Sequence, residues 1–183
     1  MLNLTDHFLV AMPNVDDEFF KGSVVYITSH STNAGTVGVI VNKPLDKKLK
    51  NAFKGLDFAH YNPNWSNNPL YLGGPVNSDN GFVLHRNIKT LSDGTLFELT
   101  NDRSILDEIA TSTDKDNLFV SIGYSSWLQS QLESEISNND WLVVKANPEL
   151  IYEVDASNRY EEALRLLGIN NISYLYTNEV ILA

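Results

Sequence analysis

Two strand-like segments that follow each other with no helix between them constrain the fold most. The first, SVVYITSH (residues 23–30), consists mainly of β-branched and aromatic residues, and the second, TVGVIVNK (residues 36–43), is apolar on both faces. Only the five residues STNAG separate them, which suits a hairpin and is too short for a helical crossover. The second segment is therefore predicted to be a central strand of a sheet.

The rest of the chain carries strand and helix patterns in an irregular order. Helical periodicity occupies residues 45–56, 101–112, 125–137 and 157–168, and further strand-like stretches occupy residues 7–12, 95–100, 117–124 and 141–146. Early strands are joined by hairpins, and strands alternate with helices only in the second half. This order favours an α+β fold with a mixed sheet. Because no linker or repeat interrupts the pattern, we predict a single domain over residues 1–183.

The stretch YLGGPVNSDNGFVLH (residues 71–85) places glycines and a proline inside a strand-like segment. We predict a hairpin in which residues 71–76 pair antiparallel with residues 81–85, and Asn77 to Asn80 form the turn. Pro75 would then lie at an edge or a bulge, because proline cannot donate to the strand ladder. A phosphate-binding loop would need a helix directly after the glycines, whereas a strand-like run follows here.

Composition narrows the classes of function. The chain of 183 residues has a net charge of −10 and no cysteine. The charge opposes contact with nucleic acid, and the missing thiols remove disulfides and thiolate metal sites. Its apolar runs are shorter than the ~18 residues of a membrane span. We therefore expect a cytoplasmic protein without a membrane partner. Five lysines concentrate in residues 43–54, which predicts either a solvated helix face or a docking site for an acidic partner.

Two patterns in the sequence bear on catalysis and on metal binding. The segment GYSSW (residues 123–127) resembles a nucleophile elbow, but Trp127 stands where the second glycine is required, and all four histidines precede Ser125. His30 and His85 end strand-like segments, and with Asp16 or Asp17 they would form a His/carboxylate metal site if they met in space. No local histidine spacing supports such a site, so we predict neither a metal nor a cofactor.

Several of these stretches together resemble one family. MPNVDDEFFKGSVVYI, GTVGVIVNKP, YLGGPV, GFVLH, GYSSWLQSQLESEI and YEEALRLLGI occur in the order and spacing of the AlgH/YqgE family of bacterial proteins, from Phe8 to Ile169. The resemblance implies a bifurcated sheet folded into a barrel-like core with helices packed around it. Two positions depart from the family pattern. Ser126 and Ser130 replace glycines, and Ser29 precedes His30 where the family usually has glutamate.

The resemblance implies a regulator of transcription without an established catalytic activity. No helix-turn-helix is visible and the charge opposes DNA contact, so regulation would act indirectly, through a protein partner or a small ligand. Polar residues that match the family and that the fold alone does not require form the predicted interaction surface: Asp16, Asp17, His30, Asn42, Lys43, His85, Gln131 and Glu133. The alternative is a small-molecule binder or an unrecognised enzyme, with its site where His30, His85, Asp16 and Asp17 converge.

Overall fold

The fold was analysed in a computed structural model, which describes residues 3–31, 33–48, 68–86, 95–102, 104–105 and 118–177. The strands in these ranges are β1 (His7–Ala11), β2 (Val24–Ser31), β3 (Gly35–Ile40), β4 (Pro44–Lys48), β5 (Pro69–Leu72), β6 (Val76–Arg86), β7 (Phe97–Thr100), β8 (Phe119–Trp127) and β9 (Trp141–Lys145). The helices are α3 (Gln131–Ser137), α4 (Pro148–Tyr152), α5 (Arg159–Leu166) and α6 (Ser173–Thr177).

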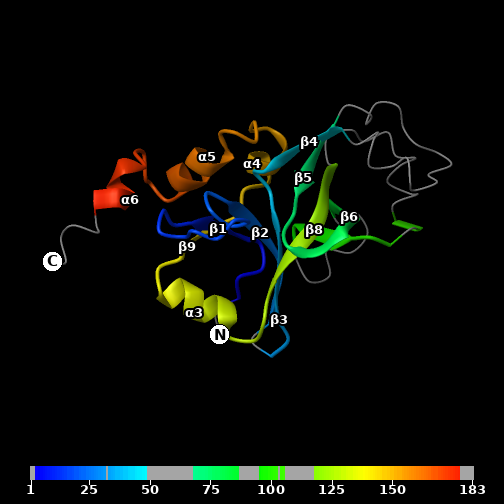
Figure 1. Cartoon of the computed structure of the whole chain (residues 1–183), viewed down its shortest axis with the longest axis horizontal. Helices are drawn as coiled ribbons and strands as arrows, with labels where there is room; N and C mark the ends of the chain where they lie inside the picture. The colour runs from blue at the N-terminus through cyan, green and yellow to red at the C-terminus, as the bar shows by residue number, and fades with distance from the viewer. Residues whose placement is uncertain are drawn as a thin grey trace.

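The strands form one mixed sheet, and the predicted hairpin of β2 and β3 lies in its middle (Figure 1). β2 and β3 pair antiparallel, with Tyr26 opposite Val39. β3 also pairs with β8, so it has a neighbour on each side, as its apolar faces predict. β1 and β9 continue the sheet beyond β2 through antiparallel pairs. The α+β class with a mixed sheet is confirmed.

The sheet divides at β8. The beginning of β8 pairs in parallel with β5, with Tyr71 opposite Ser121, and antiparallel with β6. The end of β8 pairs with β3, with Gly38 opposite Ser125. Among the described strands, the path runs from β4 to β9 and these two ends do not pair with each other. The sheet is therefore bifurcated but not closed into a barrel, because closure requires the first and last strands to pair.

The Gly-Gly-Pro segment lies at this division, and the predicted hairpin of residues 71–85 is wrong. Residues 76–86 form one strand, β6, which pairs with β7 and β8, whereas β5 pairs with β4 and β8. The turn-forming residues lie inside β6, where its register with β8 shifts between Val76 and Gly81. Gly73 instead joins two strands: its N–H donates to the carbonyl of Ile122, and its carbonyl accepts from Ile40 N–H.

The core has two layers, one on each face of the central strands. Phe8, Val10 and Tyr26 belong to the layer that α4 and α5 cover, together with Leu150 and Leu164. The alternate residues of the same strands, which include Leu9 and Val25, pack on the other face with Leu132 of α3, Trp127 and Trp141. Figure 1 shows α3 and the pair α4–α5 on opposite sides of β1 and β2. Both faces are buried, which explains why these strands lack polar alternation.

One helix begins where its local sequence favours it, whereas two other predicted helices are shortened or replaced because their residues pair with strands. Asn147 caps α4 as an asparagine before a proline favours, because its Oδ1 accepts from Glu149 N–H at 3.1 Å and Pro148 starts the helix. The helix predicted over residues 125–137 begins only at Gln131, since Ser125 to Trp127 pair with β3. Residues 44–48, at the start of the predicted lysine-rich helix, form β4, and Lys50 and Lys54 lie outside the described residues.

Candidate functional site

A groove of about 960 Å³ hollows the surface where β2, β6, β7 and β8 meet the N-terminal segment. It is lined by Asn3, Thr5, Thr28, Ser29, His30, Val37, Asn77, Phe82, Thr95, Phe97, Glu98, Leu99, Thr100, Asn101 and Tyr124. Most of these side chains are hydroxyls and amides, and the rest are mainly aromatic or aliphatic. The volume lies at the upper end of the range that small-molecule sites occupy, and it also suits a short peptide.

One wall of the groove is the strand β7. Residues 97–101 line the groove consecutively, although alternate side chains of a strand point to opposite faces. A run of this kind indicates that the edge of the strand faces the groove. β7 pairs only with β6 among the described strands. Just before β7, Leu96 N–H donates to the carboxylate of Asp6 at 3.0 and 3.2 Å, which anchors the start of the strand against the N-terminal segment.

The opposite wall is the last part of β2. Its pairing with β1 ends at Tyr26, and its register with β3 shifts between Ile27 and Ser29. Thr28, Ser29 and His30 therefore border the groove beyond the last β1 partner. The N–H of His30 is capped by Thr5 Oγ1 at 3.0 Å.

The charge of the groove is negative. Among its described lining residues, Glu98 is the sole carboxylate and no lysine or arginine contributes. Glu98 is exposed, and it lies opposite His85 in the register of β6 and β7. The rings of Phe82 and Tyr124, which also line the groove, meet edge to face at 5.2 Å. This lining favours neutral or cationic ligands over anionic ones.

His30 is the predicted site residue that lines the groove. Its side chain is 3% exposed, and its ring nitrogens contact Thr36 Oγ1 at 3.0 Å and the carboxylate of Glu133 at 3.5 Å. Glu133 comes from α3, so the acid beside this histidine is supplied by a distant element and not by the preceding residue. Gln131, on the same helix, accepts from Leu128 N–H at 3.0 Å and donates to Glu135.

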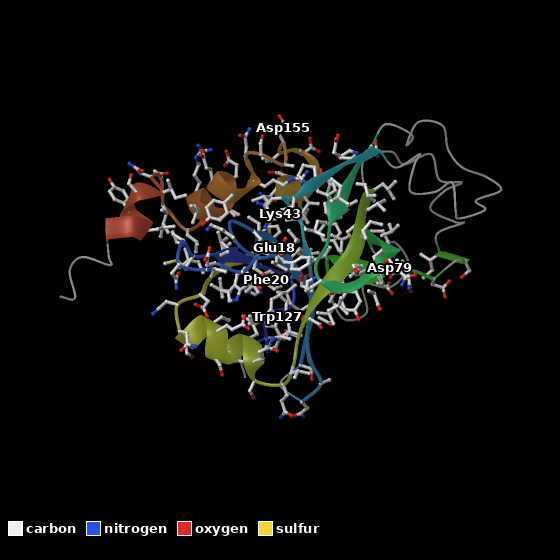
Figure 2. All side chains as sticks on the ribbon, in the orientation of Figure 1. Glu18, Phe20, Lys43, Asp79, Trp127 and Asp155 are labelled. Atoms are coloured by element: carbon white, nitrogen blue, oxygen red, sulfur yellow. The ribbon has the colours of Figure 1, made fainter. Side chains whose placement is uncertain are left out.

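Asp17 and Lys43 lie outside the groove. Asp17 belongs to the loop that precedes β2, and Lys43, labelled in Figure 2, belongs to the segment between β3 and β4. Asp17 accepts hydrogen bonds from the N–H groups of Phe19 and Phe20, at 2.8 and 3.0 Å. Lys43 Nζ donates to the Phe19 carbonyl at 2.6 Å. Burial lowers the pKa of Lys43, and the nearby carboxylate of Asp17 opposes that shift. These contacts organise the loop, and the carboxylate of Asp17 near Lys43 is itself engaged by two backbone N–H groups.

Two further predicted residues contact the same loop: Asp16 lies within it, and Asn42 reaches it from the segment between β3 and β4. Asp16 forms an exposed ion pair with Lys21 at 2.6 Å, which lowers the pKa of Asp16. Asn42 accepts from Val24 N–H at 2.8 Å and donates to the Gly22 carbonyl at 2.9 Å. Asp16, Asp17 and His85 are not among the lining residues of the groove that contains His30. The interaction surface of eight residues stays a prediction, with its members distributed over the loop before β2, β2 itself, the segment between β3 and β4, β6 and α3.

The structure also identifies residues that sequence analysis missed. Glu98 and Tyr124 line the groove, yet each looked like an ordinary member of a strand. Ser125, the serine of the elbow-like motif, is fully buried, and its hydroxyl donates to the Gly73 carbonyl at 3.1 Å. The hydroxyl of Ser125 therefore joins β8 to Gly73 at the point where the sheet divides.

The described residues show neither a clustered metal site nor a membrane-spanning helix. No three His, Cys, Asp or Glu side chains in this part of the chain are grouped so that they could hold a metal ion. None of the helices seen in it has the length and apolar character needed to cross a membrane.

Comparison with known proteins shows close relatives over nearly the whole chain. The AlgH-like family matches residues 8–172. A UPF0301 protein of Polaromonas sp. is 39% identical, with 93% of this chain and 92% of the relative covered. A UPF0301 protein of Burkholderia cenocepacia is 38% identical, with 93% and 91% covered.

Solved structures show the same architecture. The solution structure of the AlgH protein from Pseudomonas aeruginosa is similar with a TM-score of 0.76 and 32% identity, covering 95% of this chain and 93% of that one. The crystal structure of protein DIP2367 from Corynebacterium diphtheriae gives a TM-score of 0.70, with 93% of each chain covered. Its 22% identity makes this second likeness one of fold alone.

Proposed function

We propose a function from the premise that this chain belongs to the AlgH-like family. In this proposal it is a non-enzymatic regulatory protein that binds a partner protein through the groove between β2 and β7. In this proposal it influences transcription indirectly, in the cytoplasm, and does not contact DNA. The observation that carries the proposal is the groove itself, a concave polar surface bordered by two strand edges.

The distribution of the candidate catalytic groups supports binding over catalysis. An acid–base site needs its groups within hydrogen-bond reach of one reacting position. Here His30 is held by Thr36 and Glu133, whereas Asp16 and Asp17 are engaged by Lys21 and by backbone N–H groups. His30 thus borders the groove with its side chain nearly buried, and Asp16 and Asp17, the carboxylates with which an enzyme site was predicted, are not among the described lining residues. The alternative function, binding of a small ligand, would use the same groove.

An affinity-capture experiment tests this proposal with two matched variants. Ser29 is exposed and lines the groove, so Ser29→Trp would fill part of it without disturbing a buried contact. Ser157 is also exposed and lies outside the groove, so Ser157→Trp controls for a new surface tryptophan. Wild type and both variants are immobilised, exposed to native cytoplasm, and analysed for bound proteins and bound small molecules together.

We expect one or a few proteins to be captured by the wild type and by Ser157→Trp, and to be lost with Ser29→Trp. Thermal melts that agree among the three proteins would show that Ser29→Trp is folded. Capture of the same proteins by all three would contradict a groove-bound partner. Small molecules retained without a protein, and lost with Ser29→Trp, would replace this proposal by the alternative one.

A further inference from the structure

We infer that the groove binds an extended, basic segment of the partner protein, which adds as a strand to the edge of β7. This inference rests on the proposed function and specifies how the partner is recognised. The groove is bordered by β7 on one side and by the end of β2 on the other. An extended peptide beside a strand edge gains main-chain hydrogen bonds along its length, the mode known as strand addition.

Within the described part of the chain, the edge of β7 lacks the features that normally prevent strand addition. Edge strands are protected by prolines, lysines, bulges or a covering element. β4, at one end of the sheet path, has this protection in its sequence Pro-Leu-Asp-Lys-Lys. β7 has the sequence Phe-Glu-Leu-Thr, with no proline and no lysine, and β6 is its one partner among the strands that the structure describes.

The other edge strand of the path differs from β7 in its surroundings. β9 (Trp141–Lys145) ends in a lysine, and none of its residues lines the groove. Among these three edges, β7 is therefore the one that combines an unprotected sequence with a hollow beside it. Residues 97–101 line that hollow in an unbroken run, so a peptide can approach the backbone of the strand as well as its side chains.

Local hydrogen bonds fix the ends of the binding edge. The bond from Leu96 N–H to Asp6 holds the strand where it enters the sheet. On the facing wall, Thr5 Oγ1 accepts from His30 N–H, so that part of β2 already has a partner for one N–H group. The geometry thus assigns the main-chain pairing to β7, with β2 serving as a wall. Alternate side chains of the added strand would face the polar lining and the Phe82–Tyr124 ring pair.

The charges around the edge of β7 favour a basic segment. Glu98 is exposed in the middle of the edge, and no lysine or arginine is among the described lining residues. The whole chain carries a net charge of −10, which attracts a basic segment at long range. Attraction of this kind acts mainly on the rate of association and weakens as salt rises.

The experiment selects ligands from a phage-displayed library of random linear 12-residue peptides, using the folded wild-type protein as bait. We expect the enriched peptides to carry net positive charge and to lack proline in their central residues. Each selected peptide is then synthesised with one backbone amide N-methylated at a time. Because one edge of the added strand pairs with β7 and the other makes no main-chain pairs, methylation should weaken binding about tenfold or more at alternate positions only.

Protein variants test the charge. Glu98→Lys should weaken the selected peptides about tenfold at low salt, whereas Glu153→Lys, the same change at an exposed site outside the groove, should leave them within about twofold. Amide chemical shifts on binding should change most at residues 97–101. If Glu98→Lys does not fold, the N-methylation pattern on the wild type still decides the inference.

Three outcomes would overturn the inference: no enriched peptide, enriched peptides that tolerate N-methylation at every position, and a pattern of sensitivity that repeats every three to four residues. If one of these occurs while Ser29→Trp still abolishes capture of the partner, the partner uses the groove through another shape, and the proposed function stands alone. If the peptides show the alternating pattern but the partner is captured equally well by wild type and Ser29→Trp, the proposed function is contradicted. The inference that β7 accepts an added strand then still holds.

Discussion

A Cβ atom placed on Gly73 would lie 2.2 Å from the carbonyl oxygen of Gly123, so the two glycines meet in a contact that no side chain can enter. Gly123 has a φ of +68°, and a Cβ there would approach the Gly74 carbonyl to 2.5 Å. These contacts occur where β8 exchanges β5 for β3 as its neighbour. The glycines of YLGGPV are therefore required by the division of the sheet.

Replacing Gly73 with alanine tests this requirement. The new methyl group would collide with backbone and with buried Ser121, neither of which can move without shifting a strand, so we expect the free energy of unfolding to fall by about 3 kcal/mol. Urea denaturation would measure the loss. Gly81→Ala is the matched control, because its Cβ would have ordinary contact distance to the Ser121 carbonyl, at 3.9 Å. An equal loss in both variants would contradict the role given to the contact.

At Ser130, a substitution is expected to raise the free energy of unfolding. It precedes α3 with a φ of 62° and a ψ of 1°, and its side chain makes no capping hydrogen bond. Left-handed backbone costs a residue with a Cβ about 1 kcal/mol, which glycine avoids. We therefore expect Ser130→Gly to raise the free energy of unfolding by about 0.5–1 kcal/mol, as measured by the urea midpoint. Ser134→Gly, inside the helix, should lower it; a rise there or a fall with Ser130→Gly would refute the argument.

Glu135 ties two tryptophans together. Its Oε2 accepts from the indole N–H groups of both Trp127 and Trp141 at 2.8 Å, and both rings are nearly buried. Removing the carboxylate leaves two buried donors unsatisfied, so Glu135→Ala should lower the free energy of unfolding by about 3 kcal/mol. Glu135→Gln keeps an acceptor and should cost about 1 kcal/mol.

Denaturation followed by tryptophan fluorescence would measure both Glu135 variants. Glu133→Ala on the same helix is the control, because its partly exposed contact with His30 contributes no more than about 1 kcal/mol. A smaller loss for Glu135→Ala than for Glu133→Ala would show that the indole bonds contribute little.

Tyr26 makes stability depend on pH in the alkaline range. Burial raises the pKa of Tyr26 far above its ordinary value of 10.0, and its hydrogen bond to Asp6 adds to the shift. The folded protein therefore keeps this proton at a pH where the unfolded chain loses it. The stabilisation is fully present below pH 10 and is lost as the pH rises, by about 1.4 kcal/mol per pH unit.

The variant Tyr26→Phe should remove this part of the alkaline slope, although it lowers stability at neutral pH by losing the bond to Asp6. Urea midpoints between pH 8 and pH 11 would measure both effects. Tyr174→Phe is the control, because Tyr174 is 64% exposed and should leave the slope unchanged. Equal slopes above pH 10 in wild type and Tyr26→Phe would contradict the assignment.

Duplex DNA should not be bound specifically at physiological salt. The net charge of −10 repels phosphates, and no groove-reading motif is visible in the sequence. Footprinting with excess competitor DNA would check this expectation. A protected site that survives the competitor would refute indirect regulation, whereas weak retardation at low salt alone would be accounted for by the lysines of residues 43–54.

Local chemistry in the sequence determined the elements whose partners are near in the chain. The short STNAG link between two β-rich segments determined the hairpin of β2 and β3, and Asn147 with Pro148 determined the start of α4. The alternation of strands and helices in the second half determined the fold class. In each case the decisive interactions lie within a few residues, where turn and capping preferences act directly.

Tertiary structure alone decided the division of the sheet and the groove. Asn77 to Asn80 have strong turn preferences, yet they lie inside β6, because the residues on either side of them, Val76 and Gly81, pair with β8 about forty residues later in the chain. The acid beside His30 comes from α3, and the groove exists because β7 pairs with β6 while β2 ends against Thr5. Pairings between distant strands depend on which buried surfaces fit together, a property that no local pattern of residues contains.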